Sequence, residues 1–266
     1  MLRDLVMVRG GGDIASGIIH RLWNSGFRIA VLEIEQPTVV RRTVSFAQAV
    51  FDGHMVVEGV ASIKIESAGD ILGTIDTGKI PVLIDERAFS IDKLKPDVLV
   101  DAILAKQNIG THIKMANIVI GVGPGFCAGV DVHAVIETNR GHNLGRVIYE
   151  GRAEPNTAVP GEIHGYAMER LIRSPSAGII RHAAKIGDII KKGDPVAYVG
   201  DTPVCAQIDG VLRGLMEKGI KVEKNEKVGD VDPRCNPQHC YTISDKARSI
   251  GGGVLEAVMH LGAVRK

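Results

Sequence analysis

The fold is decided by a glycine-rich stretch near the start of the chain, Leu5-Val6-Met7-Val8-Arg9-Gly10-Gly11-Gly12-Asp13-Ile14-Ala15-Ser16-Gly17. Its four leading apolar residues are typical of a buried strand. After the glycines, Ile14, Ile18 and Leu22 recur at helical spacing. A second apolar strand follows at residues 28–32. The stretch therefore predicts a strand, a glycine turn, a helix and a second strand in succession.

The glycine turn matches the pattern of a dinucleotide-binding loop. Gly10, Gly12 and Ala15 have the G-x-G-x-x-G/A spacing, and an acid, Glu33, stands where it can bind a ribose hydroxyl. Backbone amides at a helix start attract phosphate, and glycine lets it approach. Asp13 would repel phosphate there, so we expect it to cap the helix. Nucleotide binding and a purely structural turn both remain open. The candidate cofactor-binding residues of this part are Gly10, Gly11, Gly12, Asp13, Ala15 and Glu33.

Further apolar runs at 80–84, 97–101 and 116–120 end at acids or at a glycine. Strands spaced by helical or irregular segments indicate a parallel sheet, and ligands gather at the carboxyl ends of such strands. We therefore expect residues 1–165 to form a Rossmann-like nucleotide- or cofactor-binding domain, with these strand ends at one site.

The segment 121–146 concentrates the chemistry of the chain. It opens with Gly121-Val122-Gly123-Pro124-Gly125, a turn whose amides can wrap an anion. An acid and several cationic or titratable side chains follow. The candidates for cofactor binding are Gly123, Pro124, Gly125, Glu137, Arg140 and Arg146, and His142 is a candidate catalytic residue that moves a proton. The alternative is a tight turn followed by a solvated hairpin.

The pattern changes after residue 166. Residues 177–181 recur 32 positions later as 209–213, which suggests a small β-sandwich with two similar halves. Residues 170–232 resemble a biotinyl/lipoyl-type barrel-sandwich hybrid. That family carries its cofactor on a lysine, but the corresponding hairpin, 200–205, has none. We expect a docking or lid module instead of a carrier.

The remaining part, 233–266, contains Cys235, His239 and Cys240, then a helix at 244–261 that glycines 251–253 break. The cysteine spacing is not that of a zinc knuckle, and we name no metal site. A soft-metal site, a reactive thiol and inert cysteines stay open; if a thiol is catalytic, we expect Cys240.

Composition excludes several classes of function. The chain has 32 basic and 31 acidic residues, a net charge of +1 and no basic stripe with interleaved aromatics, so we expect no nucleic-acid partner. We find no apolar run of membrane-spanning length and no leader, so we expect a cytoplasmic protein without a membrane partner. Four cysteines do not suggest a disulfide scaffold. A homo-oligomer stays open.

Five motifs in order resemble one family over nearly the whole chain. They are Arg9-Gly10-Gly11-Gly12-Asp13-Ile14-Ala15-Ser16-Gly17, Gly121-Val122-Gly123-Pro124-Gly125-Phe126, Glu137-Thr138-Asn139-Arg140-Gly141-His142, Leu144-Gly145-Arg146 and Gly229-Asp230-Val231-Asp232-Pro233-Arg234. The chain is similar to accessory proteins of selenium-dependent molybdenum hydroxylases, the YqeB-type family, whose role is like that of the xanthine dehydrogenase accessory factor.

The resemblance implies a maturation factor that handles the molybdopterin cofactor, or the labile selenium or sulfur ligand of its metal. It implies a molybdenum hydroxylase as protein partner and a phosphate-bearing small molecule, a molybdopterin-type cofactor or a nucleotide, as ligand. It does not imply that the chain itself hydroxylates. Whether the chain is an enzyme stays open. The alternatives are an NAD(P)-dependent oxidoreductase that uses the first glycine turn and Glu33, and a non-catalytic scaffold that docks on the hydroxylase.

Overall fold

The computed structural model describes residues 5–157 and 159–264, in two compact units. Unit 1 comprises Met1–Pro37, Ser45–Thr157 and Ile243–Lys266, and unit 2 comprises Thr38–Val44 and Ala158–Thr242. The predicted third part, 233–266, is thus divided between the units. Residues 38–44 join unit 2 because Leu215 N–H donates to the Val40 carbonyl at 2.8 Å and the Arg42 guanidinium pairs with Glu217 at 2.6 Å.

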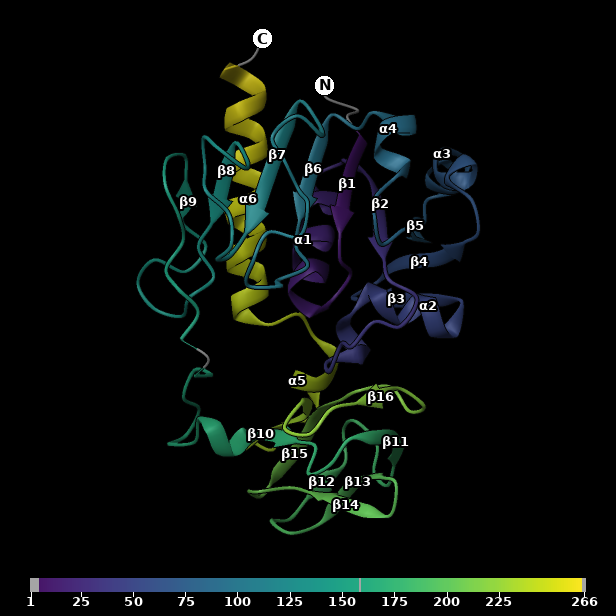
Figure 1. Ribbon diagram of the computed structural model, residues 1–266, viewed down its shortest axis with the longest axis vertical. Coiled ribbons are helices and arrows are strands. Elements are labelled where there is room, and N and C mark those ends of the chain that lie inside the picture. The colour runs from purple at the N-terminus through teal and green to yellow at the C-terminus, as the bar shows by residue number, and fades with distance from the viewer. Residues whose placement is uncertain (1–4, 158, 265–266) are drawn as a thin grey trace. The chain divides into compact units, whose positions relative to one another are not determined.

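Unit 1 is built on a nine-stranded sheet with the order β3-β4-β5-β2-β1-β6-β7-β8-β9 (Figure 1). The strands from β4 to β8 in this order run parallel to their neighbours, and the two edge strands, β3 and β9, are antiparallel. The strands are β1 (Leu5–Arg9), β2 (Arg28–Glu33), β3 (His54–Val57), β4 (Val60–Ile65), β5 (Ile80–Ile84), β6 (Val98–Asp101), β7 (Ile118–Val122), β8 (Ala134–Ile136) and β9 (Val147–Ile148).

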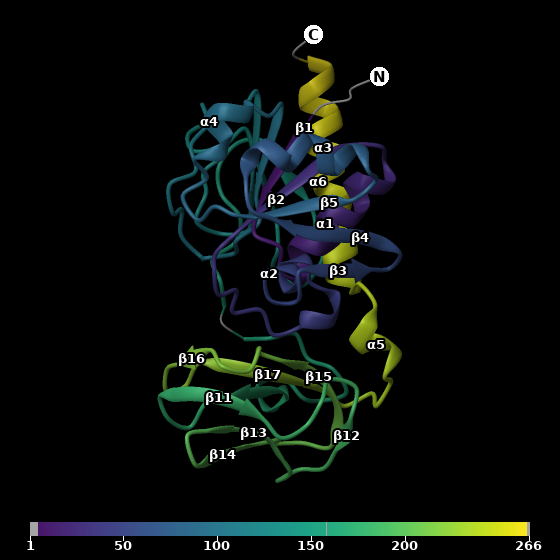
Figure 2. The same cartoon turned by 90° about the vertical axis from the view of Figure 1, so that its right-hand side faces the viewer.

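Two long helices, α1 (Asp13–Asn24) and α6 (Asp245–Val264), lie side by side on one face of this sheet (Figures 1 and 2). The opposite face packs an aliphatic core against α3 (Ile71–Asp76) and α4 (Ser90–Leu94). The short elements α2 (Ala49–Asp52), η2 (Phe46–Gln48) and η3 (Ala68–Asp70) complete the unit. None of the described helices has the length and apolarity that a membrane crossing requires.

The predicted break at glycines 251–253 was wrong, because α6 is continuous there. These glycines serve close packing: a Cβ at Gly251 would lie 2.8 Å from the carbonyl oxygen of Gly17 on α1. A Cβ at Gly252 would meet nothing within 4 Å. The absence of a side chain at Gly251 therefore allows the two helix backbones to approach.

The predicted fold class was wrong for unit 1, because its sheet is mixed and not parallel throughout. Glu58 and Gly59 both have positive φ, 44° and 83°, which is the geometry of a two-residue hairpin turn. This turn folds β3 back on β4. At the other edge β9 folds back on β8. The first reversal is a two-residue turn, whereas the second is made by the longer segment 137–146.

Unit 2 consists of two four-stranded antiparallel sheets, β10-β17-β15-β12 and β14-β13-β11-β16. Its elements are η1 (Arg42–Val44), η4 (Met168–Arg170), β10 (Leu171–Arg173), β11 (Gly178–His182), β12 (Ile189–Ile190), β13 (Pro195–Val199), β14 (Thr202–Cys205), β15 (Gly210–Leu215), β16 (Lys221–Val222), β17 (Lys227–Asp232) and α5 (Gln238–Tyr241). The repeated segments form β11 and β15, one in each sheet.

The predicted biotinyl/lipoyl-type barrel-sandwich hybrid was also wrong. The unit is completed by pieces outside the predicted 170–232 module. Residues 38–44 bond to the end of β15, and α5 packs on β15 and η1. A repeat within the module does not reveal these distant additions.

Candidate functional site

A buried ion pair lies at the carboxyl ends of two adjacent central strands of the sheet, β1 and β6. Arg9 ends β1, Asp101 ends β6, and the two are partners in register. Arg9 Nη1 lies 3.3 Å from Asp101 Oδ2 and donates to Thr111 Oγ1 at 2.5 Å. The Thr111 hydroxyl donates in turn to Asp101, and Arg9 Nη2 donates to the Glu86 carbonyl. This network fixes the loops that follow β5 and β6.

The first glycine turn bonds to the protein itself. Gly11 N–H donates to the Glu33 carboxylate at 2.6 Å, and Ala47 N–H donates to the Gly11 carbonyl at 2.9 Å. A Cβ at Gly11 would lie 2.8 Å from the Ala47 nitrogen. Burial raises the pKa of Glu33, and the N–H groups of Gly11 and Ile34 lower it. The Glu33 side chain therefore faces the turn.

At the start of α1, the residue that precedes the helix is Gly12, and it provides no side-chain cap. Asp13 is the first helical residue, so the prediction that its side chain caps the helix was wrong. A negative charge in the first turn still favours the helix, because it faces the positive end of the dipole. Ala15 is fully buried.

The second glycine turn lies at the same sheet edge as the first. At Gly125, φ is 111° and a Cβ would lie 2.7 Å from Gln107 Cα. At Gly10, φ is 90° and a Cβ would lie 3.1 Å from the Ala102 carbonyl oxygen. Ala102 and Gln107 belong to one loop, which follows β6 between β1 and β7. The sheet thus brings the two turns to one edge, and the backbone of this loop packs against both.

Gly123 and Pro124 complete the second turn. Gly123 N–H donates to the Ile136 carbonyl at 2.9 Å, and a Cβ at Gly123 would lie 2.9 Å from Thr138 Oγ1. Pro124 has no N–H to donate and is half-buried. The glycines at this turn serve close packing against β8 and the residues after it.

Glu137 is buried and organises the segment that follows β8. Its Oε1 accepts the N–H groups of Thr138 and Asn139, both at 2.7 Å, and its Oε2 accepts that of Glu154 at 2.8 Å. Its own N–H donates to the Arg146 carbonyl. Three backbone donors to one carboxylate hold two separate chain segments together.

Of the neighbouring candidates, Arg140 makes a two-point contact with Asp245 at the start of α6, at 2.9 and 3.2 Å. His142 and Arg146 are exposed. Among the described residues, no hydrogen bond or ion pair engages the side chain of either one. Both are therefore available to a ligand.

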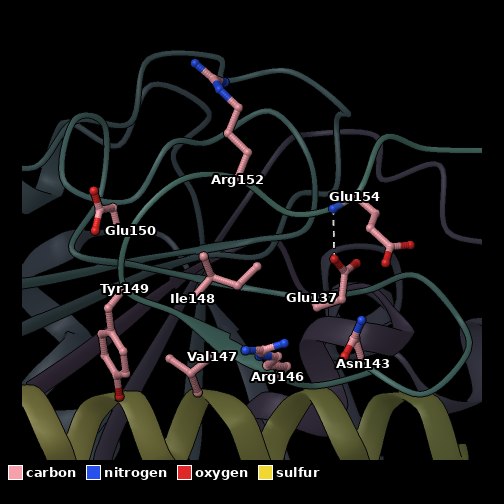
Figure 3. A pocket seen from close by; sticks show the side chains of 9 residues that line it. All are labelled: Glu137, Asn143, Arg146, Val147, Ile148, Tyr149, Glu150, Arg152 and Glu154. Carbon is pink, nitrogen blue, oxygen red and sulfur yellow. Dashed lines mark hydrogen bonds between the residues drawn. The ribbon is translucent and has the colours of Figure 1, made fainter.

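A shallow pocket of about 480 Å³ lies beside this segment, above α6 (Figure 3). It is lined by Glu137, Asn143, Arg146, Val147, Ile148, Tyr149, Glu150, Arg152 and Glu154. Arg146 lies close to the helix between Val147 and Asn143, whereas Arg152 points away from it (Figure 3). Glu154 accepts from the Asn139 amide at 2.5 Å. Burial raises the pKa of Tyr149, and Glu256 adds to this effect. The pocket combines cationic donors with carboxylate acceptors.

Lys246, in the first turn of α6, is a candidate that the sequence reasoning missed. It lies within electrostatic reach of Asp13, Glu137 and Arg140, which are three of the predicted residues. No local pattern in the sequence links the start of α6 to these segments. Only the packing of α6 beside α1 and β8 brings them together.

In unit 2, Cys240 is fully buried and its Sγ lies 3.7 Å from the Leu212 carbonyl. Burial raises the pKa of the thiol, although Arg213 and Arg41 act in the opposite direction. A buried thiol with a raised pKa is a poor nucleophile, so the geometry does not favour catalysis by Cys240. Cys205 and Cys235 are exposed. In the described residues, no group of three or more His, Cys, Asp or Glu side chains is arranged to hold a metal ion.

The last of the five sequence motifs forms a buried charge network in unit 2. Asp232 is fully buried and accepts from Arg234 Nη2 at 2.6 Å, while Asp230 pairs with Arg170 at 3.3 Å. Burial raises the pKa of Asp232, but the hydrogen bonds and charge of Arg234 outweigh it and bring the value to about 2. Arg213 lies between the two carboxylates, at 3.8 and 3.9 Å.

Comparison with known proteins found no matching family model. A curated relative, the uncharacterized protein YqeB of Escherichia coli K12, is 52% identical over 258 residues, which are 97% of this chain. The chain spans about half the length of this relative, since the alignment covers 48% of YqeB. The similarity supports the YqeB-type family that the motifs indicate.

Similarity to solved structures is weak. An aspartoacylase family protein from Mesorhizobium loti is 11% identical, with a TM-score of 0.28 over 85% of this chain and 84% of that one. For a succinylglutamate desuccinylase/aspartoacylase from Rhodobacter sphaeroides the identity is 10% and the TM-score 0.27, over 86% and 85%. The names of these proteins concern neither molybdenum nor selenium. Scores this low support no inference about the function of this chain.

Proposed function

We propose, from the premise that this chain is YqeB-like over nearly its whole length, that it is an accessory protein in the maturation of a selenium-dependent molybdenum hydroxylase. In this proposal, the pocket of unit 1 beside Arg146 binds the phosphate-bearing cofactor. The role in maturation comes from the five-motif resemblance. The place of binding comes from the pocket, whose arginines have no partner among the described residues.

The pocket carries the proposal because its rim is held in place before a ligand arrives. Glu137 accepts three backbone N–H groups, and its own backbone bonds to both Arg146 and Gly145. Arg146 therefore projects from a fixed backbone position. A guanidinium can donate two parallel hydrogen bonds to a phosphate, and little entropy is lost when its backbone is already ordered.

The residues present fit a molybdopterin-type phosphate ester. The volume of about 480 Å³ is within the usual range for small-molecule sites. Arg146 and Asn143 supply donors for a phosphate, and Glu150 supplies an acceptor for ring N–H groups. Such a cofactor, when bound, would bring the metal-ligand chemistry. The residues of this chain would bind it and orient it.

The carboxylates of the rim also argue for a ligand with a single phosphate. Three glutamates line the pocket, against two arginines. Two of these carboxylates are already hydrogen-bonded, Glu137 to backbone N–H groups and Glu154 to Asn139. A polyanion would still be repelled by Glu150, whereas a pterin monophosphate brings both an anion and N–H donors. We expect the monophosphate to bind more tightly than pyrophosphate.

Isothermal titration calorimetry with a pterin monophosphate tests the site. Arg146→Gln should weaken binding at least about tenfold, the low end of what a charged hydrogen bond contributes. Arg28→Gln is the matched control, because Arg28 is a surface arginine of the same unit that pairs with Asp76 and does not line this pocket. Equal affinity of the wild-type protein and Arg146→Gln would remove the pocket from the proposal.

The role in maturation needs a separate experiment. A selenium-dependent molybdenum hydroxylase is produced with no accessory chain, with the wild-type chain or with Arg146→Gln, and its molybdenum content and activity are measured. The proposal expects active hydroxylase only with the wild-type chain. If both chains restore activity equally, the scaffold alternative replaces cofactor binding. If neither raises activity above the level without an accessory chain, the maturation role fails.

A further inference from the structure

One aromatic side chain lines the pocket beside Arg146. Tyr149 directly follows β9 and is 39% exposed. Its ring centroid lies 4.8 Å from that of His260 on α6, and the two ring planes are tilted by 48°. This separation is within the range at which aromatic rings attract each other. The contact therefore holds the Tyr149 ring at the pocket while leaving much of its surface uncovered.

His260 contacts the ring from outside the cavity. It lies near the C-terminal end of α6 and does not line the pocket. Burial raises the pKa of Tyr149, and the charge of Glu256 raises it further, so the phenol is neutral at physiological pH. A neutral ring does not repel a phosphate ester. Because the ring is already packed against His260, it loses little rotamer freedom when a ligand covers it.

The ring stands at a limited distance from the phosphate donor. Side chains alternate between the two faces of a strand, so Val147 and Tyr149 share one face of β9. Arg146, Val147 and Tyr149 all point toward α6, with Val147 between the other two (Figure 3). Three residues of chain separate the Cα atoms of Arg146 and Tyr149, a span of at most about 11 Å. One wall of the pocket thus presents a cation, an aliphatic side chain and an aromatic ring in succession.

We propose that Tyr149 stacks on the heteroaromatic ring of the ligand whose phosphate binds Arg146, and that His260 is a positioning residue for this stack. The inference rests on the proposed function, because it concerns the same pocket. It specifies the ligand class as a flat heteroaromatic ring joined to its phosphate by a short chain. A phosphate ester without such a ring gains nothing from Tyr149.

Isothermal titration calorimetry of the full-length protein tests the stack with two probes, a pterin monophosphate and ribose 5-phosphate. Tyr149→Leu should weaken binding of the pterin monophosphate at least about fivefold, the low end of what one stacked base contributes. Tyr149→Phe keeps the ring and should bind this probe as tightly as the wild-type protein. Neither variant should change the affinity for ribose 5-phosphate. Tyr166→Leu is the matched control, because Tyr166 is 41% exposed and does not line the pocket.

NMR spectra of the bound pterin monophosphate separate stacking from a general change of the pocket. Protons over the face of an aromatic ring shift upfield, so the pterin ring protons should shift with the wild-type protein and with Tyr149→Phe, but not with Tyr149→Leu. His260→Ala should reduce this shift and the affinity for the pterin monophosphate, while the affinity for ribose 5-phosphate stays constant. An unchanged shift and affinity in His260→Ala would overturn its positioning role.

The stack and the phosphate site can fail separately. If Tyr149→Leu binds the pterin monophosphate as tightly as the wild-type protein, or weakens both probes equally, the stack is overturned, and the phosphate site at Arg146 is judged by Arg146→Gln alone. If the wild-type protein does not bind the pterin monophosphate, the proposed function fails and the stack fails with it.

Discussion

Replacing Arg9 should destabilise unit 1 strongly, because the substitution leaves a buried carboxylate behind. The Arg9 side chain is 5% exposed and that of Asp101 is 2% exposed. In Arg9→Met, Asp101 keeps the Thr111 hydroxyl and the Ile103 N–H as donors but loses its counter-charge. Removal of one partner of a buried ion pair costs about 3–5 kcal/mol. For a unit of this size we expect the melting temperature to fall by about 6–20 °C.

The assay follows the fluorescence of Trp23 during urea unfolding. Trp23 is the only tryptophan of the chain and lies on α1, so its signal reports unit 1. A double-mutant cycle with Asp101→Leu completes the test. Asp101→Leu alone should lower the free energy of unfolding by a similar amount, since it leaves the Arg9 guanidinium buried without its counter-charge. The double variant should lose much less than the sum of the two single losses.

The refuting results are specific. If Arg9→Met lowered the free energy of unfolding by less than about 1 kcal/mol, the Arg9–Asp101 pair would contribute no more than a solvent-exposed ion pair. Additive losses in the double variant would mean that Arg9 and Asp101 stabilise the fold independently. Either result would contradict the view that this pair fixes the loops after β5 and β6.

Three further predictions concern packing, acid stability and thiol reactivity. Gly251→Ala should destabilise unit 1 by about 1–3 kcal/mol through overpacking against α1, whereas Gly252→Ala in the same helix should stabilise it by about 0.5–1 kcal/mol. Urea unfolding of the two variants measures these changes, and equal effects would contradict the packing role of Gly251. The pKa of Asp232 is lowered, so its contribution to the stability of unit 2 is complete above the unfolded pKa near 3.8 and is lost as the pH falls towards about 2. Asp232→Asn should remove about 2 kcal/mol of the pH dependence of this stability between these pH values. An unchanged stability profile in acid would contradict the pairing of Asp232 with Arg234. With a thiol reagent such as iodoacetamide, Cys205 and Cys235 should react in the native protein and Cys240 only after unfolding, by peptide mass spectrometry; prompt native labelling of Cys240 would contradict its burial.

The sequence predicted individual strands well and the sheet as a whole poorly. β1, β2 and β5 lie where apolar runs next to turn residues indicate them, since burial on both faces leaves a continuous apolar signal. The edges were missed. β3 is largely exposed and β9 is only two residues long, so neither carries much periodicity. Antiparallel edges of this kind depend on pairing that a local pattern does not encode.

The candidate site was predicted only in part, because a local sequence pattern reveals residues that are neighbours in the chain but not those that packing brings together. Glu137 and Arg146 were found because they belong to one dense segment, and both line the pocket. Lys246 was missed because only the packing of α6 brings it near Glu137 and Arg140, which are distant from it in the sequence. Cys240 was nominated from residue type alone, and burial, which decides thiol reactivity, is not visible in a six-residue motif.

The two glycine turns show why a glycine-rich motif does not by itself establish phosphate binding. A turn that cradles phosphate and a turn that packs against backbone both require residues without side chains. In this fold, β6 lies between β1 and β7, so its following loop reaches both turns, at Ala102 and Gln107. The glycines at positions 10 and 125 are thereby explained without a ligand. Among the described residues, an unengaged cationic side chain lies farther along the edge, beyond β8, at Arg146. A ligand that needs positive charge should therefore bind beyond β8, and substitution of Gly10 or Gly125 should impair folding before it impairs binding.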